Sequence, residues 1–266
     1  MSSDWPAEAM LACVRASPEA VAAHDKAAWL GLFADDAEVH DPVGSRGHAG
    51  HSAIARFYDT FIAPNDIHFE VLAEGACDDV VFRDVVIHTR MGTGLAVVVP
   101  AHIRYRLTAA ADDGALRVRR LDAHWELRRM VGQSLRAGPR GWITHARLST
   151  HMLACQGLGG VLGFMRGFRG VGTRGTRVAT RFLHAIRAGS RSDAAALLAT
   201  DVVLREPGRR DVALDHLCAS AGNLQWHKLI AAGRHVTASL ERDGHPGLAL
   251  FTLDRRRRIE RLRFHF

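Results

Sequence analysis

Asp41 is the residue whose surroundings most suggest chemistry. It lies in the stretch 33–45 (FADDAEVHDPVGS), at the expected end of a short strand and directly before Pro42. This stretch is too polar for a core strand and too apolar for a plain loop. A carboxylate at the rim of an apolar cavity, with its motion limited by a proline, can take a proton from carbon. The alternative is that Asp41 only ends the strand and caps the next loop.

A second set of polar candidates lies in the run 80–90 (VVFRDVVIHTR). Period-2 alternation puts Phe82, Asp84, Val86 and His88 on one face of a strand. If that face lines a cavity, Asp84 and His88 are interior polar groups that need partners. The alternatives are a satisfied structural pair, or a position on the outer, domain-facing side of the sheet.

Aromatic side chains supply the remaining candidates. Tyr58 and Tyr105 are the only tyrosines, and both fall at positions expected to face the cavity. As ordinary core aromatics they would instead bond their hydroxyls to backbone. An apolar lining, as a lipid-like ligand requires, is completed by Phe57, Phe61, Ile103, Leu121 and Ala123.

The elements that position these residues follow from hydrophobic spacing. The pattern predicts helix within 6–33, with a start at Ser17-Pro18-Glu19, a short strand at 37–40 and an amphipathic helix over 51–61. Four strand-like runs follow, separated by glycine and aspartate turns, at 67–75, 80–90, 95–107 and 116–127. Helices first and an antiparallel meander afterwards predict an α+β domain with helices packed on one face of a curved sheet.

The pattern returns in shorter form after residue 172. TDVVLREPG lies over DDAEVHDPVG and places Glu206 on Asp41, with helices expected at 178–198 and 211–221 and strands near 224–232, 234–241, 247–253 and 258–266. We predict two divergent copies of one domain: 1–128 with the candidate pocket, a helical, glycine- and arginine-containing connector at 129–172, and a shorter, degenerate copy at 173–266. Packing of the connector across the neighbouring domains is favoured over a membrane-surface helix because its glycines weaken an isolated helix. The second copy keeps little besides Glu206, so we interpret it as a structural partner.

Composition narrows the function classes. The formal charge is +7 with Lys26 and Lys228 as the only lysines, and a solvated arginine-rich surface is favoured over nucleic-acid binding because no reader motif accompanies the charge. Four scattered cysteines indicate reduced thiols and a cytoplasmic location. Neither a signal peptide nor a membrane-spanning helix is expected. With no glycine-rich phosphate loop and no metal-ligand spacing, no cofactor is expected.

The pair LFADDAEVHDPVGS and HSAIARFYDTF resembles the ketosteroid isomerase branch of the NTF2-like (SnoaL-like) superfamily. The resemblance covers residues 10–127 well and 175–266 weakly. It implies a cone of helices against a strongly bent sheet, with the ligand in the mouth of the cone, and hence two NTF2-like domains in this chain. It also implies that Asp41 is the general base and that Trp125 is an aromatic wall of the site. Family members commonly dimerise sheet on sheet, which implies an internal pseudo-dimer; further homo-oligomerisation stays open.

The resemblance also implies two donors for an enolate oxygen, a tyrosine on the first helix and a protonated aspartate on a strand. This chain has Ser17 and Ala101 at those positions. A slip of one residue would put His102 at the acid, but it would turn Ile103 and Tyr105 out of the core. Two functions therefore compete. One is cofactor-free proton-transfer chemistry of the steroid isomerase or polyketide cyclase kind on a small hydrophobic ketone, and the other is a non-catalytic binding or scaffold module.

Overall fold

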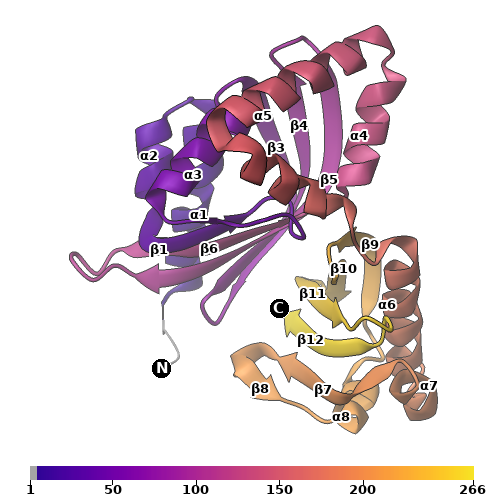
Figure 1. Cartoon of the computed structure of the whole chain (residues 1–266). Coiled ribbons are helices and arrows are strands. Elements are labelled where there is room, and N and C mark those ends of the chain that lie inside the picture. Colours follow the sequence, from indigo (N-terminus) through magenta and orange to yellow (C-terminus); the bar gives the residue numbers. More distant parts are fainter. Residues whose placement is uncertain (1–4) are drawn as a thin grey trace.

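Two six-stranded sheets, each with helices against one face, make up the chain (Figure 1). The computed structural model describes residues 5–266, without the side chains of Arg209 and Arg210. The first four residues of the N-terminal stretch, where no signal peptide is expected, lie outside this range. The α+β class predicted from the sequence is confirmed.

The first sheet has the strand order β2-β1-β6-β5-β4-β3. Strand β1 pairs parallel to β6, and all other neighbours are antiparallel. Asp78, with φ of 56°, makes the tight turn from β3 to β4. The strands are β1 (Phe33–His40), β2 (His48–Ala49), β3 (Asn65–Cys77), β4 (Val80–Met91), β5 (Ala96–Ala109) and β6 (Leu116–His124).

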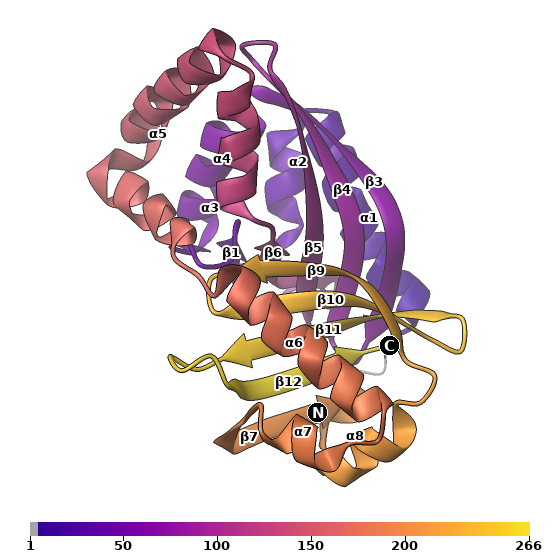
Figure 2. The same ribbon diagram turned by 90° about the vertical axis from the view of Figure 1, so that its right-hand side faces the viewer.

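Helices cover the inner face of this sheet and close one end of the space between the sheet and these helices. Those on the inner face are α1 (Ala7–Ala22), α2 (Lys26–Gly31), α3 (His51–Phe57) and the π-helical turn η1 (Tyr58–Ile62). The sequence predicts a helix start at Ser17-Pro18, which is wrong: Pro18 lies inside α1, and the new start is Asp25, whose side chain accepts a hydrogen bond from Ala28 N at 2.8 Å. After β6 come α4 (Leu127–Arg136), α5 (Pro139–Met165) and η2 (Arg166–Phe168), and α5 arches over the mouth (Figures 1 and 2).

The second sheet repeats the strand order of the first, β8-β7-β12-β11-β10-β9, again with one parallel pair, β7 with β12. The arginine run 255–258 forms the turn between β11 and β12 and is exposed at residues 255–257. The elements are α6 (Gly172–Arg187), α7 (Arg191–Ala195), β7 (Leu198–Glu206), η3 (Pro207–Arg209), β8 (Arg210–Asp211), α8 (Leu214–Ser220), β9 (Gln225–Ala232), β10 (His235–Arg242), β11 (His245–Leu253) and β12 (Ile259–His265).

The two sheets pack on each other through the faces that their helices leave uncovered. In Figure 2 the strands of the second sheet run across those of the first, while α6 covers the opposite face of the second sheet. His102 on β5 bonds to Thr237 and Ser239 on β10, at 2.7 and 2.8 Å. The backbones also meet: a Cβ built on Gly44 would lie 2.7 Å from Gly233 Cα. Residue 44 therefore requires glycine, both for this close approach and for its φ of 100°.

Candidate functional site

An apolar cavity of about 150 Å³ lies between the first sheet and its helices. Its walls come from α1, from the strands of the first sheet, from α3 and η1, and from α4 and α5, which close the mouth. Only a few polar side chains reach it, among them Asp41, Ser17 and Tyr105. A largely apolar space with few convergent polar groups is typical of sites for small hydrophobic molecules.

Asp41 follows the last residue of β1, is partly buried and lines this cavity. Trp125 Nε1 donates a hydrogen bond to Asp41 Oδ1 at 2.5 Å. The loop after Asp41 is held by two further bonds, from Val43 N to Ala123 O at 2.8 Å and from Ser45 Oγ to Pro42 O at 2.6 Å. The carboxylate is therefore fixed against the aromatic wall.

Burial raises the pKa of Asp41 from 3.8 to about 6, and the hydrogen bond from Trp125 acts in the opposite direction. Such a carboxyl is mostly ionised at neutral pH. It also accepts a proton more readily than an exposed aspartate, which suits a general base.

Two residues with hydroxyl groups, Ser17 and Tyr105, also line the cavity. Ser17 Oγ accepts a hydrogen bond from Trp29 Nε1 at 3.1 Å, so its own hydrogen can be donated, to Tyr105 or to a ligand. Burial raises the pKa of Tyr105; Arg83 and a hydrogen bond with Ser17 lower it, and the charge of Asp41 raises it. Tyr105 therefore stays a neutral O–H donor within the electrostatic reach of Asp41.

Base, neutral donors and apolar walls together can transfer a proton at a carbon beside a carbonyl group. Among residues 5–266 no group of three or more His, Cys, Asp or Glu side chains is arranged to hold a metal ion.

Comparison with known families covers most, but not all, of the residues that line the cavity. Residues 14–118 match the family model of the SnoaL-like domain. These residues form a SnoaL-like domain. The match spans less than half of the chain and leaves the second sheet outside it.

Three solved structures similar to this chain each cover 45% of it and 95% of their own length, with a TM-score of 0.40. They are a Δ5-3-ketosteroid isomerase from Mycobacterium sp. (28% identity), a Mycobacterium tuberculosis protein in complex with estradiol-17β-hemisuccinate (26%) and a computationally designed 17-OHP binder (24%). A search of curated proteins gave no match.

Most of the predicted aromatic and apolar candidates line the cavity of the SnoaL-like domain. They are Phe57, Phe61, Ile103, Tyr105, Leu121, Ala123 and Trp125. The choice of Ala101 over His102 for the inner face of β5 is confirmed, since Ala101 is fully buried in the first core and His102 bonds to the second sheet.

The placement of Phe82, Asp84, Val86 and His88 on the cavity side is wrong. Ile87 and Thr89 line the cavity instead, so the even-numbered residues of β4 face outward. The period was correct, but the second sheet buries part of the outer face. Both faces of β4 are therefore partly apolar, and alternation alone does not say which is inner.

Asp84 belongs to the contact between the two sheets and not to the cavity. Its carboxylate forms an ion pair with Lys228 and accepts a short hydrogen bond from Ser239 Oγ. Lys228 Nζ also donates to Val85 O at 3.1 Å and Ala101 O at 3.3 Å. Although burial acts to raise it, the pKa of Asp84 is lowered to about 2 by these partners and His102, so the carboxylate stays charged. His88 pairs with Glu70 at 3.0 Å in a half-exposed position.

Tyr58 does not line the cavity. It lies in η1 with its ring centroid 5.4 Å from that of Trp29, and its hydroxyl is buried with no hydrogen-bond partner among the described residues. Phe57 and Phe61, four residues apart, both line the cavity, and Tyr58, one position after Phe57, points to a different side of this helical segment.

Sequence reasoning missed the closing wall formed by Met130 on α4 and by Leu148 and Phe164 on α5. Phe164 stacks on Phe61 with centroids 5.4 Å apart. The apolar, glycine-rich composition of 129–172 was the available signal, but it does not specify which domain the segment covers. In the second unit, Glu206 bonds to His216 at 3.0 Å and lies 3.8 Å from Arg242, so it is already paired.

Proposed function

We propose that the SnoaL-like domain binds a small hydrophobic ketone, steroid-like or polyketide-like, and that Asp41 is the general base for proton transfer at carbon. The observation that carries this proposal is a carboxylate with a pKa of about 6 that lines an apolar cavity. The hydrogen bond from Trp125 keeps its oxygen in one place, which favours transfer from a fixed substrate carbon.

Tyr105 and Ser17 take the role of the missing oxyanion donors in this proposal. Removing a carbon-bound proton places negative charge on the ketone oxygen, and neutral hydroxyl donors stabilise that charge. Loss of one such donor typically costs about 10²–10³ in rate. Tyr105→Phe should therefore slow turnover by about this factor while leaving ligand binding nearly unchanged.

The size of the cavity bears on the ligand. Sites for drug-sized molecules usually measure about 300–1,000 Å³, whereas this one encloses about 150 Å³. We infer that a ligand of one or two rings fits the closed form, and that a four-ring steroid requires α5 to move outward with Leu148 and Phe164.

The second candidate function is non-catalytic ligand binding or a scaffold role. Ser17 and Ala101, at the positions where the family has its stronger donors, favour it, and fold alone does not fix function. The two candidates differ in one respect: a catalyst loses turnover in Asp41→Asn while it retains binding, and a binding module has no turnover to lose.

The experiment adds a Δ5-3-ketosteroid to the purified chain and follows formation of the conjugated enone by absorbance. Wild type, Asp41→Asn and Tyr105→Phe are compared, and displacement of a fluorescent steroid reports binding in each. Turnover that depends on Asp41 supports the catalytic proposal. Saturable displacement without turnover supports the binding module or a different ketone. Neither turnover nor displacement would contradict the steroid-like ligand.

We further infer that the chain contains two copies of one domain, 1–128 and 173–266, joined by 129–172. The repeated strand order of the two sheets supports this inference. The sheets would then form an internal pseudo-dimer.

A cytoplasmic location is proposed from the four free cysteines, Cys13, Cys77, Cys155 and Cys218. No helix in 5–266 is long and apolar enough to span a membrane.

A further inference from the structure

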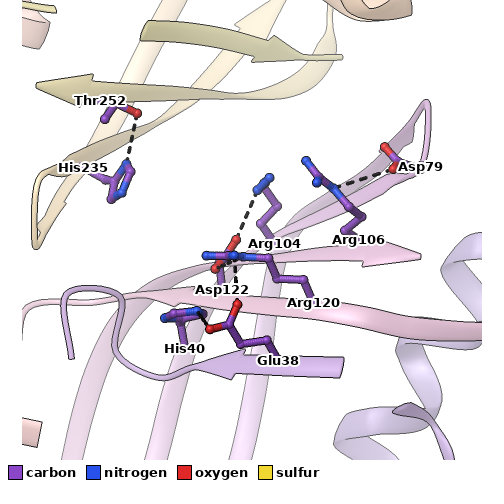
Figure 3. A network of polar contacts seen from close by, with 9 residues as sticks. All are labelled: Glu38, His40, Asp79, Arg104, Arg106, Arg120, Asp122, His235 and Thr252. Carbon is purple, nitrogen blue, oxygen red and sulfur yellow. Dashed lines mark hydrogen bonds and ion pairs between the residues drawn. The ribbon is translucent and has the colours of Figure 1, made fainter. Parts of the chain in front are cut away.

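A second cavity, of about 270 Å³, lies between the two sheets and is lined mainly by arginine. It is separate from the apolar cavity although both use β5 and β6: Arg104 and Arg106 alternate with Ile103 and Tyr105 along β5 and point to the opposite face. Figure 3 shows Arg104 and Arg106 projecting from the first sheet toward His235 and Thr252 of the second.

Positive charge in this cavity exceeds the negative charge available to it. Its lining contains one carboxylate, Asp122, and the arginines Arg104, Arg106, Arg120, Arg261 and Arg263. Asp122 is shared between Arg104 Nη1 at 3.2 Å and Arg120 Nε at 2.8 Å. Even when Glu38, bonded to Arg120, and Asp79, 3.6 Å from Arg106, are counted with Asp122, the arginine charges outnumber the carboxylates by two.

Several buried nitrogen atoms in the cavity have no hydrogen-bond partner among the described residues. They include Nε of Arg104, Nε of Arg263 and Nδ1 of His124, and Nε of Arg106 has only its ion pair with Asp79 at 3.6 Å. The Arg104 side chain is only 6% exposed. Such groups are rarely left unsatisfied in folded proteins, so each one needs an explanation such as an ion or bound molecule.

The pKa values of the cationic side chains in the cavity are lowered by burial and by neighbouring positive charges. Burial, together with Arg106, Arg263 and Arg120, lowers the pKa of Arg104 to about 10, against the opposing effect of Asp122. Burial lowers the pKa of His124 to about 3 and that of His235 to about 4, with the neighbouring arginines acting in the same direction. Both histidines are therefore neutral at neutral pH, and the excess charge resides on the guanidinium groups.

We propose that the cavity between the sheets is a binding site for a small dianion of the phosphate class, either inorganic phosphate or a phosphomonoester. The excess of two positive charges matches a dianion. The planar, multi-donor guanidinium group suits tetrahedral oxyanions, which it binds through paired N–H···O bonds. Thr252, whose hydroxyl is 3.2 Å from His235 Nδ1, adds a neutral polar group from the second sheet. The site requires both sheets, because Arg104, Arg106 and Arg120 come from one and Arg261 and Arg263 from the other.

The test is calorimetric titration of the full chain with inorganic phosphate at about pH 8, with ionic strength held constant by sodium chloride. Arg263→Gln removes one cavity arginine. Arg256→Gln is the matched control, because it removes an arginine from the exposed turn between β11 and β12. We expect saturable binding of one phosphate per chain, weakened at least about tenfold by Arg263→Gln and unchanged by Arg256→Gln.

A thermal measurement keeps the comparison informative if Arg263→Gln is less soluble. Phosphate should raise the midpoint of thermal unfolding of the wild type more than chloride of equal ionic strength does. In Arg263→Gln or Arg261→Gln, phosphate and chloride should give the same midpoint. Glycerol 3-phosphate that binds more tightly than phosphate would assign a phosphomonoester, and one that binds equally or more weakly would assign inorganic phosphate. The proposal is overturned by the absence of saturable binding, by equal weakening in Arg256→Gln, or by tighter binding of succinate than of either phosphate.

Discussion

Replacing Trp125 with phenylalanine should raise the pKa of Asp41. The substitution keeps an aromatic wall but removes the N–H that donates to Asp41 Oδ1 at 2.5 Å. A hydrogen bond to a charged group contributes about 1.5–3 kcal/mol, and one pH unit corresponds to about 1.4 kcal/mol. The pKa should therefore rise from about 6 to roughly 7–8 in Trp125→Phe. At neutral pH most of the carboxylate would then be protonated and unable to act as a base.

The assay follows the side-chain carboxyl ¹³C shift of labelled aspartate against pH. Asp41→Asn identifies the resonance, because it removes that signal alone. Trp142→Phe is the matched control, since Trp142 lies exposed on α5, 65% accessible to solvent. An Asp41 pKa that stays the same or falls in Trp125→Phe would refute the claim that the indole N–H stabilises the charged carboxylate.

The same pKa makes a prediction about stability. The folded pKa of Asp41 lies above its unfolded value, so the folded chain binds this proton more tightly. The stability contributed by the protonated carboxyl is present below about pH 4 and is lost as the pH rises through about 6. Asp41→Asn should therefore increase the free energy of unfolding at neutral pH, by at most about 3 kcal/mol, and leave it unchanged near pH 4. Urea unfolding at both pH values measures this, and a stabilisation that is the same at both would contradict it.

Three further predictions concern packing. Lys228→Met leaves Asp84 charged and buried between the sheets, so it should destabilise by about 3–5 kcal/mol, whereas Asp84→Asn with Lys228→Met should cost clearly less; an equal loss in urea unfolding would count against the ion pair. Gly44→Ala should destabilise more than Gly94→Ala, because both have positive φ but only the new Cβ at 44 meets backbone, at 2.7 Å; equal thermal midpoints would refute the close contact. Phe164→Ala removes a ring from the closing wall and so enlarges the cavity, which should tighten the binding of a fluorescent steroid. Ile143→Ala, at an exposed position of α5, is the control and should leave binding unchanged; weaker binding by Phe164→Ala would argue that Phe164 contacts the ligand.

The local sequence pattern was sufficient to predict most strands of the first sheet and the position of Asp41. Apolar spacing and turn residues predicted β3 to β6 to within a few residues, and the 33–45 segment placed Asp41 beside an apolar space. The alternation on β5 correctly put Ile103 and Tyr105 inside. These features are set by neighbours a few residues apart or by the buried face of one sheet.

What the sequence did not reveal depends on contacts between distant segments. The sequence pattern of β4 assigns its outer face to the cavity, because the partners that bury Asp84 there, Lys228 and Ser239, lie some 150 residues away in the chain. The arginines were expected in solvent, yet Arg104 is only 5% exposed beneath the second sheet. The alternation of apolar residues along a strand indicates that one face of the strand is buried, but it does not indicate which segment of the chain buries it.

The most direct test of the central claim is hydrogen exchange at the carbon beside a bound carbonyl. 1-Tetralone, a two-ring ketone suited to the closed cavity, is incubated with protein in deuterated buffer, and deuterium uptake at the α-carbon is followed by NMR. The account predicts uptake above the uncatalysed rate with wild type, uptake at the uncatalysed rate with Asp41→Asn, and similar ketone affinity for both. Equal uptake with the two proteins, or wild-type uptake at the uncatalysed rate while the ketone is bound, would contradict the role of Asp41 as base.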